Sequence, residues 1–401
     1  MVAQTKSLFN RYNLIKTGIR VDARLNSILL CHWILCAYSV YYGYPIVFEI
    51  KIANKDLLSH VYLSDLVYQQ GLSDFILSDV NLFSMTALGG AQTSASVSTS
   101  CRDQTDLSKL VVFAEGLHLQ QLIQVTQALS DCINPVFYRV IKVEGVSGFA
   151  VCAHVNLKTQ NNVNTQLDDV AKRFSVELCL VDKVPSLDEP GLLLMDMDST
   201  VIAVECIDEI AELAGVGEQV SAVTLLAMQG KLDFAQSLRT RVACLVDADE
   251  SILQQVRDAL PLMPGVANLV KILKSYDWKV AIASGGFSYF ADYLQDRLNL
   301  DAAVANDLTI QNNKLTGTVK GDIVDANVKA QTLKSLAEQW SISPSQTVAM
   351  GDGANDLVMM NAAALGVALH AKPIVVQQAD IAIRRGNLDT LLWVLEAGRL
   401  N

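Results

Sequence analysis

Two aspartates that follow an uncharged stretch are the strongest sign of chemistry in this sequence. Residues 191–195 carry no charge, and Asp196 and Asp198 come directly after them. Because successive side chains of a strand alternate between its two sides, we expect both carboxylates on the same side. Two like charges this close are costly to bury unless a cation, a shared proton or a phosphoryl-transfer reaction compensates. The pair favours catalysis over packing, with a turn at the end of a strand as the alternative.

A serine followed by two glycines forms a second polar cluster. Ser284 and Gly285 precede a predicted helix over 287–298. A helix start at which glycine permits close backbone approach is a ready site for an anion. The arrangement favours phosphate binding, with a plain serine N-cap beside turn glycines as the alternative.

A lysine and an acidic turn complete the set of candidate residues. Lys329 lies early in a predicted helix over 326–340, where the helix dipole disfavours a cation. A bound phosphate would offset that conflict, and a solvated surface lysine is the alternative. Residues 351–356 (GDGAND) contain Asp352 and Asn355. These residues could form a functional acidic motif, and an ordinary turn built from Gly, Asp and Asn is the alternative.

The elements that would hold these residues are short apolar strands alternating with amphipathic helices from residue 186 onward. The pattern predicts a doubly wound, Rossmann-like α/β fold, in which helices cover both faces of a parallel sheet. Ligands gather at the carboxyl ends of strands in such sheets, which is where the polar clusters fall. About 80 residues separate the first two strands, so a helical cap over 203–265 is predicted as an insertion. The predicted strands are 192–197, 279–283, 302–305, 347–350 and 366–369.

Residues 106–185 are predicted to form a separate α+β domain. The order strand, helix, strand, strand, helix, strand is that of a ferredoxin-like sandwich. With Gly116 in the first strand-to-helix turn, this order resembles the ACT family of small amino-acid-sensing modules. The residues leave a sensor, a structural domain and a dimerising domain open, so a homodimer through the N-terminal domains is one expectation. The predicted elements are 109–114, 118–130, 136–143, 148–156, 163–174 and 176–181.

The first 105 residues receive no assigned function. Residues 89–100 are small and polar and are typical of a linker. Residues 25–48 contain no Asp, Glu, Lys or Arg and are long enough to cross a bilayer. Polar and helix-breaking residues interrupt their apolar pattern, which disfavours a membrane span. We therefore divide the chain into 1–105, 106–185 and 186–401.

Composition excludes some classes of partner. The 401 residues include 31 Lys and Arg against 42 Asp and Glu, which gives a net charge of −11. Without a basic run, nucleic acid and anionic membrane surfaces are disfavoured as partners. The eight cysteines show no metal-binding spacing and lie mostly in apolar runs. They are typical of reduced core thiols in a cytoplasmic protein.

Taken together, the motifs of residues 192–390 resemble the haloacid dehalogenase superfamily of aspartate-nucleophile phosphotransferases. They occur in that superfamily's order and on the expected elements, and four motifs together are far more specific than one. The matching residues are 196–200 (DMDST), Ser284, Lys329 and 351–356 (GDGAND).

The resemblance implies a role for each residue. Asp196 would be the nucleophile that forms an aspartyl-phosphate, and Asp198 the general acid and base, which requires a raised pKa. Mg²⁺ would separate the carboxylate from the phosphate dianion, held by Asp196, Asp352 and the backbone carbonyl of Asp198. Asn355 and Asp356 are implied to orient the metal ligands or the phosphate. The residues implied to contact the substrate phosphate are Ser284, Gly285, Lys329 and Asn355.

Within the superfamily, residues 196–241 most resemble the phosphoserine phosphatase family. That resemblance implies that Glu205 meets the substrate ammonium, that Arg241 meets its carboxylate, and that Met228 and Phe234 shield the site from water. A free amino-acid head group needs one anion and one bidentate cation, and Arg suits a carboxylate better than Lys. A first-turn acidic residue and a solvated arginine are the alternatives for Glu205 and Arg241.

The implied activity is Mg²⁺-dependent hydrolysis of O-phospho-L-serine in the last step of serine biosynthesis. Another small phosphomonoester, or transfer of the phosphoryl group to another alcohol, stays open within the enzyme class. Two other classes also stay open: an amino-acid-responsive module with a degenerate phosphatase half, and a phosphatase anchored by residues 25–48. The intact set of candidate residues speaks against degeneracy.

Overall fold

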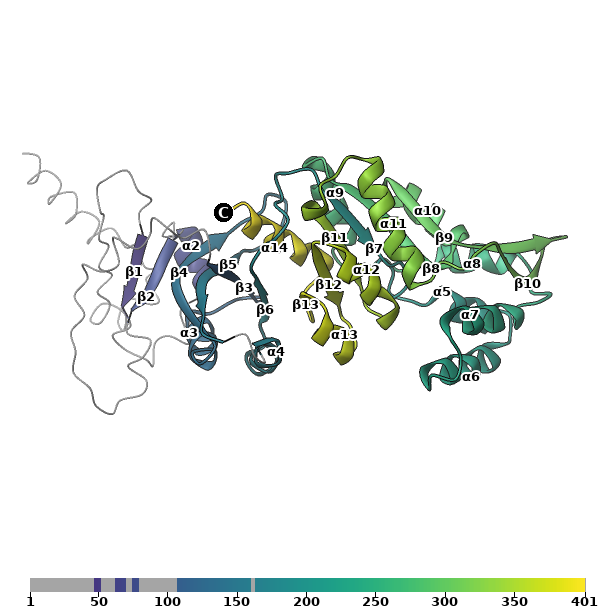
Figure 1. Cartoon of the computed structure of the whole chain (residues 1–401), viewed down its shortest axis with the longest axis horizontal. Coiled ribbons are helices and arrows are strands. Elements are labelled where there is room, and N and C mark those ends of the chain that lie inside the picture. The colour runs from purple at the N-terminus through teal and green to yellow at the C-terminus, as the bar shows by residue number, and fades with distance from the viewer. Residues whose placement is uncertain (1–46, 52–61, 70–73, 79–106, 160–162, 401) are drawn as a thin grey trace, which may run out of the picture.

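The chain folds around two β-sheets (Figure 1). The computed structural model describes residues 47–51, 62–69, 74–78, 107–159 and 163–400. A six-stranded sheet comes first, a seven-stranded sheet follows, and helix α14 (Leu391–Gly398) lies between the two. The predicted linker at 89–100 and nearly all of 25–48 lie outside the described residues.

The first domain contains the six elements predicted between residues 109 and 181, in the predicted order, and its four strands belong to the six-stranded sheet. Four of its strands pair antiparallel in the order β4-β5-β3-β6. The resemblance of this region to the ACT family stays a prediction. The elements are β3 (Ser108–Phe113), α3 (Leu119–Ala128), β4 (Ile133–Ile141), β5 (Ala150–Leu157), α4 (Val163–Phe174) and β6 (Glu177–Val181).

Two strands absent from the prediction extend this first sheet, and a helix absent from it lies between them in the chain. Strand β1 (Val47–Lys51) pairs parallel with β2 (Asp74–Ser78), and β2 pairs antiparallel with β4. The helix is α2 (Leu63–Gln69). Each strand is only five residues long and its partners are distant in sequence, so local patterns gave little sign of them.

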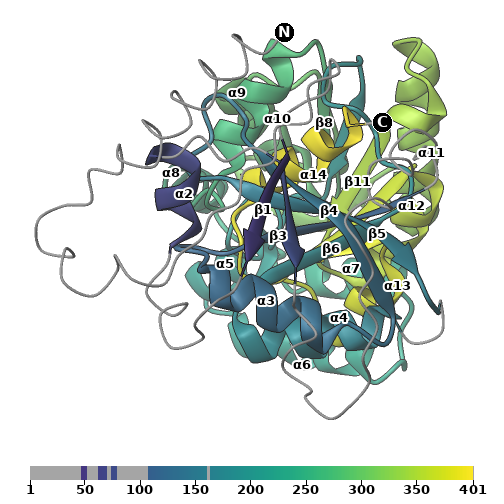
Figure 2. The same ribbon diagram turned by 90° about the vertical axis from the view of Figure 1, so that its left-hand side faces the viewer.

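Helices α3 and α4 lie side by side on one face of the six-stranded sheet (Figures 1 and 2). Side chains of β3 alternate between the two faces of the sheet, and Leu110 and Val112 pack in the apolar core beneath these helices. Val111 and Phe113 point the other way and join the core of the second sheet. The two sheets therefore share a continuous apolar core through β3.

The seven-stranded sheet contains all five predicted strands. Its order is β10-β9-β8-β7-β11-β12-β13, and only β10 and β9 pair antiparallel. The strands are β7 (Leu192–Met195), β8 (Lys279–Phe287), β9 (Ala302–Gln311), β10 (Lys314–Lys320), β11 (Thr347–Gly351), β12 (Leu365–Leu369) and β13 (Ile381–Ile383). Two strands were not predicted: β13 has three residues, and β10 has a mixed, largely polar sequence with a shift in register between Leu315 and Val319.

Helices cover both faces of this sheet, which confirms the doubly wound α/β fold. Met195 and Ile282 pack with one set of helices, and Leu194 and Ala281 pack with the other. The first set is α9 (Val266–Ser275), α10 (Ser288–Leu298) and α14. The second set is α11 (Ala326–Gln339), α12 (Leu357–Ala362) and α13 (Pro373–Gln378).

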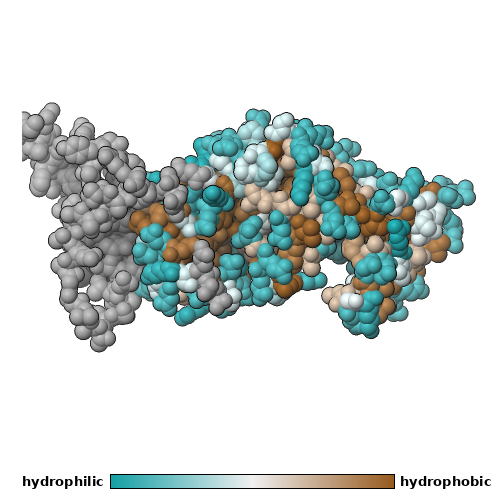
Figure 3. Space-filling view, viewed as in Figure 1, coloured by the Kyte–Doolittle hydropathy of each residue, from teal (hydrophilic) through white to brown (hydrophobic). Residues whose placement is uncertain are grey.

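Four helices are inserted between β7 and the helix α9 that leads into β8. They are α5 (Cys206–Leu213), α6 (Gly217–Met228), α7 (Phe234–Ala243) and α8 (Ser251–Asp258). Helices α6 and α7 project away from the sheet, and Figure 3 shows a recess between them and the rest of the domain that contains the seven-stranded sheet. The β9–β10 hairpin supports the insertion, because the backbone N–H of Asp247 donates to the carbonyl of Leu315 at 2.9 Å. The cap limits of 203–265, and the domain boundaries near 105 and 185, stay our proposals.

Two further expectations concern membranes and thiols. None of the described helices is both long and apolar enough to cross a bilayer. Cys132, Cys152, Cys179 and Cys206 are free and buried, and Cys244 is free and half-buried, as predicted for core thiols.

Candidate active site

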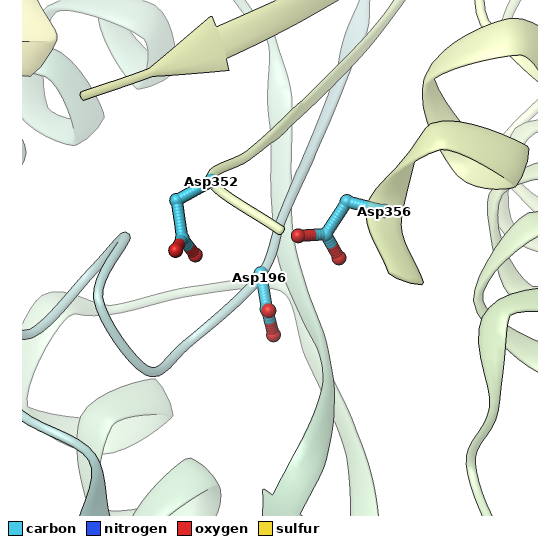
Figure 4. A group of neighbouring side chains, drawn as sticks. All are labelled: Asp196, Asp352 and Asp356. Carbon is cyan, nitrogen blue, oxygen red and sulfur yellow. The ribbon is translucent and has the colours of Figure 1, made fainter. Parts of the chain in front are cut away.

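Carboxylates gather at the carboxyl edge of the seven-stranded sheet (Figure 4). Asp196 follows β7 and Asp352 follows the neighbouring strand β11, while Asp356 ends the turn Ala354–Asp356. Figure 4 shows the three side chains converging, and one oxygen of each lies within 4.8 Å of the others. Burial, with the charges of Asp196 and Glu205, raises the pKa of Asp352 to about 6.

Lys329 supplies a positive charge to this cluster. Its Nζ lies 2.8 Å from Oδ1 of Asp196 and 2.7 Å from Oδ1 of Asp356, and its side chain is 1% exposed. Burial opposes the charge of Lys329, but the two carboxylates outweigh burial and raise the pKa of the amine above its usual range. A phosphate was the partner predicted for this cation near a helix start; in the structure, two carboxylates fill that role.

Asp356 is the candidate whose importance the sequence pattern understated. Its side chain is fully buried, Oδ1 accepts from Lys329, and Oδ2 accepts from the backbone N–H of Gly353 at 3.0 Å. Burial and the charge of Asp196 raise the pKa of Asp356 above its usual range. Asn355, half-buried, donates to the same carboxylate at 3.4 Å. The GDGAND turn contained this signal, but a turn alone does not reveal which acidic side chain faces inward.

Asp198 lies beside the cluster, although not for the reason predicted. Strand β7 ends at Met195, and Asp198 lies in a tight turn in which the N–H of Val201 donates to the carbonyl of Met197 at 2.8 Å. The expectation of strand alternation over 192–197 is therefore wrong. Burial, followed by the charges of Glu205 and Asp196, nevertheless raises the pKa of Asp198 to about 8.

Ser284 and Gly285 lie in a bulge within β8. The predicted strand ends at residue 283, whereas β8 continues to Phe287, with its register against β9 shifted between Ala283 and Phe287. Ser284 is 1% exposed, and its Oγ accepts from the N–H of Gly286 at 2.9 Å. A Cβ at Gly286 would lie 2.7 Å from Oδ2 of Asp198, so the bulge lies directly against the acidic cluster.

Glu205 and Arg241 come from the cap helices. Glu205 is the residue before α5, and its Oε1 accepts from the hydroxyl of Ser199 at 2.8 Å. Desolvation, with the charges of Asp196 and Asp208, raises the pKa of Glu205, and Ser199 and Arg241 oppose this rise. Arg241, on α7, has a buried Nε with no hydrogen-bond partner among the described residues. Buried donors are nearly always paired, so this unpaired N–H makes Arg241 a candidate for binding a ligand.

The two predicted shielding residues differ in position. Phe234 is the first residue of α7, and its ring lies over Gly285: a Cβ there would be 2.4 Å from its Cζ. Met228, the last residue of α6, is 68% exposed. Of the two, the structure brings Phe234 to the site and leaves Met228 in solvent.

Comparison with known proteins shows which family the chain belongs to. Residues 191–364 match the family model of haloacid dehalogenase-like hydrolases. The chain is 58% identical over 222 residues to a phosphoserine phosphatase of Haemophilus influenzae, a match that covers 55% of this chain and 71% of that protein. It is 53% identical over 235 residues to a phosphoserine phosphatase of Vibrio cholerae, covering 59% and 72%. The chain belongs to the phosphoserine phosphatase family.

The similarity to a solved structure extends beyond residues 186–401. That structure is the unliganded crystal structure of a probable phosphoserine phosphatase from Vibrio cholerae, with a TM-score of 0.64 and 42% identity. The match covers 77% of this chain and 92% of that chain, a larger share than residues 186–401 alone. The phosphoserine phosphatase family membership makes this chain a hydrolase and confirms the resemblance that the motifs indicated.

Proposed function

We propose that the protein hydrolyses O-phospho-L-serine to L-serine and inorganic phosphate, the last step of serine biosynthesis, with Mg²⁺ as cofactor. The observation that carries the proposal is a buried carboxylate, Asp196, held 2.8 Å from Lys329 beside Asp352 and Asp356. It occurs in a chain 58% identical to a phosphoserine phosphatase over 222 residues.

Asp196 is the proposed nucleophile. Its Oδ1 accepts from Lys329 and from the N–H of Met197 at 2.7 Å, which fixes the carboxylate in one orientation. A carboxylate oxygen attacks phosphorus and forms an aspartyl-phosphate while the bond from phosphorus to the serine oxygen breaks. The covalent intermediate divides one difficult displacement into two easier steps.

Asp198 is the proposed general acid and base. With a pKa of about 8, its carboxyl is mostly protonated at neutral pH and can give its proton to the leaving serine oxygen. The resulting carboxylate then takes a proton from the water that attacks the aspartyl-phosphate. Phosphate leaves, Asp196 is released, and Asp198 is again protonated.

The carboxylate cluster suits a hard divalent cation. Asp196, Asp352 and Asp356 crowd their charges within 4.8 Å, and the raised pKa of Asp352 indicates that one cation, Lys329, does not compensate all of them. Both oxygens of Asp356 accept hydrogen bonds, whereas Lys329 and Met197 contact only Oδ1 of Asp196, so we assign Mg²⁺ to Asp196, Asp352 and the backbone carbonyl of Asp198. Bound Mg²⁺ would reduce the repulsion between the nucleophile and the phosphate dianion.

The phosphoryl oxygens are assigned to four residues of two elements and one turn. The β8 bulge offers a hydroxyl and glycine amides, and α11 offers the buried ammonium, which are the donors that a phosphate requires. Phe234 covers the bulge and excludes water. The proposed phosphate contacts are Ser284, Gly285, Lys329 and Asn355.

Glu205 and Arg241 are assigned to the amino-acid head group. The structure leaves Nε of Arg241 without a partner among the described side chains, which a substrate carboxylate would satisfy. The charge of Arg241 opposes the rise in the pKa of Glu205, and a substrate ammonium beside this carboxylate would act in the same direction. A phosphomonoester without an amino-acid head group would need neither residue.

Phosphate release from a panel of small phosphomonoesters tests the activity. We expect turnover of phosphoserine with Mg²⁺, a small fraction of it after chelation, and much slower turnover of glycerol phosphate. Asp196→Asn should abolish turnover once mass spectrometry has excluded deamidation. Native activity of that variant would disprove the nucleophile assignment.

The head-group assignment has its own test. Arg241→Lys removes the planar, bidentate donor, so we expect a rise in KM for phosphoserine of about tenfold or more. Arg239→Lys, exposed on the same helix, is the matched control. Equal KM values for Arg241→Lys, Glu205→Gln and the parent would disprove the amino-acid substrate.

Location and association complete the proposal. The described cysteines are free and mostly buried, which suits a reducing compartment, and we propose the cytoplasm. Association of two copies through the N-terminal domains stays an expectation that size-exclusion chromatography with light scattering would test.

A further inference from the structure

The side-chain amide of Asn306, on β9, forms hydrogen bonds with two residues that are distant from it in sequence. The residue is 2% exposed. Its Nδ2 donates to the carbonyl of Gly285 at 2.9 Å, and its Oδ1 accepts from the N–H of Val324 at 2.9 Å. A neutral amide is the side chain that offers one donor and one acceptor in this fork.

The two segments that Asn306 joins carry the proposed phosphate contacts. Gly285 belongs to the bulge that contains Ser284. Val324 precedes Asp325, whose carboxylate caps α11 by accepting from the N–H of Asn327 at 2.8 Å. Lys329 lies in the first turns of this helix. One buried side chain therefore connects the hydroxyl side of the phosphate site to the ammonium side.

We propose that Asn306 is a positioning residue that sets the separation between the Ser284 bulge and the helix of Lys329. The proposal rests on the proposed function of these two elements as phosphate contacts. Groups that stabilise a reacting phosphoryl must be held within a few tenths of an ångström, and residues outside the site do this through hydrogen bonds. Loss of one bond would let the bulge and the helix move apart without removing any contact residue.

Calorimetry with inorganic phosphate on the Mg²⁺-loaded protein tests the proposal. Asn306→Asp keeps the shape and the acceptor but loses the donor, so a carboxylate faces the carbonyl of Gly285. We expect phosphate to bind about tenfold or more weakly, with kcat also reduced. Asn312→Asp, exposed in the hairpin at the end of the same strand, should change binding less than about twofold.

A purely structural role predicts a different result. Asn306→Asp would then be less stable to urea while phosphate affinity and kcat/KM equal those of the parent, and this outcome overturns the proposal. Asn306→Leu, which removes both bonds without adding charge, provides a second test if the aspartate variant does not fold. Phosphate binding is measured without turnover, so weakened binding supports the role of Asn306 even if phosphoserine proves not to be the substrate.

A second inference concerns Glu177 of β6, which lies 3% exposed between the two sheets. Its carboxylate accepts from three consecutive backbone N–H groups that follow β13: Arg384 at 3.1 Å, Arg385, and Gly386 at 3.1 Å. Three donors on one buried carboxylate are a strong, charge-assisted attachment. The segment after β13 is thereby held by the N-terminal module, which we define as residues 107–181.

The same segment continues to the point where the cap returns to the core. The N–H of Leu388 donates to the carbonyl of Pro264 at 3.0 Å. Gly265, with φ +86°, lies so close that a Cβ there would be 2.8 Å from Oδ1 of Asp389. Asp389 in turn accepts from Asn268 at 3.1 Å.

A loop of the module reaches this point from the other side. Nδ2 of Asn268 donates to the carbonyl of Gly145 at 3.2 Å as well as to Asp389. The chain that enters the cap also joins here, because the N–H of Met263 donates to the carbonyl of Val201 at 2.9 Å. Both connections of the cap therefore meet at a place that the module contacts twice.

We infer that the N-terminal module holds the hinge of the cap, through Glu177 and the segment 384–389. The inference is independent of the substrate. A cap that covers a site must open to admit a ligand, and hinges are short segments at the ends of elements. Loosening the segment 384–389 should loosen residues 261–266, although no module residue lies in the site.

Hydrogen exchange with mass spectrometry on the full chain tests this coupling. In Glu177→Gln we expect amides of 384–386 and also of 261–266 to exchange about tenfold or more faster than in the parent. Glu144→Gln, an exposed change in the module beside Gly145, should leave both segments unchanged.

Faster exchange confined to 384–386 in Glu177→Gln, or no change at all, would overturn the inference. Asn268→Ala approaches the hinge from the second contact and serves if the Glu177 variant unfolds. It too must accelerate exchange at 261–266 for the inference to hold.

Discussion

Replacing Lys329 with methionine would leave two buried carboxylates without their shared cation. The ammonium lies 2.8 Å from Asp196 and 2.7 Å from Asp356, and methionine keeps the length and the apolar stem. At an effective dielectric constant of about 20, each contact is worth about 6 kcal/mol of Coulomb energy before desolvation is subtracted. Breaking a buried pair by removing one partner costs about 3 to 5 kcal/mol net. Folded domains are stable by about 5 to 15 kcal/mol, so the variant should fold with a reduced margin.

The loss should depend on pH with a defined sign. Without Lys329, the pKa of Asp356 rises further above its usual range. A carboxyl whose pKa is higher in the folded than in the unfolded state stabilises the protein below the unfolded pKa, and this contribution disappears as pH rises through the folded pKa. The deficit relative to the parent is therefore small near pH 5 and largest near pH 8.

Urea unfolding of metal-free proteins at pH 5 and pH 8 measures this deficit. Lys334→Met, exposed on the same helix, is the control for a lost lysine. Adding Asp356→Asn to Lys329→Met removes one of the unpaired charges and should restore part of the stability. The reasoning is refuted if Lys329→Met at pH 8 is within about 0.5 kcal/mol of the parent.

Three further predictions concern the metal, the cap and the bulge. The pKa of Asp352 is about 6, so Mg²⁺ must displace a proton below that pH. The Kd of the protein for Mg²⁺, measured by calorimetry, should therefore fall as pH rises from 5 to 7. A constant Kd would count against Asp352 as a ligand. Met228→Ala, at a position 68% exposed, should change kcat/KM less than about twofold, whereas Phe234→Ala should lower it about tenfold; equal effects would contradict the placement of these two side chains. In Gly285→Ala the new Cβ would lie 2.4 Å from Cζ of Phe234 and should displace the cap, so we expect KM to rise. Gly230→Ala, where a Cβ meets nothing within 4 Å, is the control for an added methyl group. Because the φ of Gly230 is +73°, which Asn tolerates better than Ala, Gly230→Asn is a second control.

The catalytic edge was predictable because parallel strands bring their ends together. Asp196 and Asp352 follow apolar strands, Ser284 lies near the end of another, and a doubly wound sheet has one carboxyl edge on which they can meet. The helical spacing of apolar residues was also sufficient to predict α4 with its observed ends. These features depend on local pattern and on a general rule of topology.

Other features depend on partners that no local pattern identifies. Ser284 and the glycines after it were interpreted as the start of a helix, but pairing with β9 continues the strand through a bulge. Asp356 faces inward because its carboxylate pairs with Lys329, which lies 27 residues earlier in the chain. Asn306 meets Gly285 and Val324 through side-chain bonds that only the assembled sheet defines. Met228 matched a family position, and yet the end of α6 leaves it in solvent.

The outer strand β10 ends the seven-stranded sheet at an edge that is protected in several ways. An open strand edge offers unpaired backbone groups on which another chain can grow a continuous sheet. Here Lys314 and Lys320 place a charge at each end of that edge, and Gly317, with φ +74°, lies within the irregular stretch between them. A second molecule would face like charges, a broken ladder of donors and backbone groups of Leu315 that Asp247 and Ala248 already bind, all of which disfavour sheet-to-sheet association at this border.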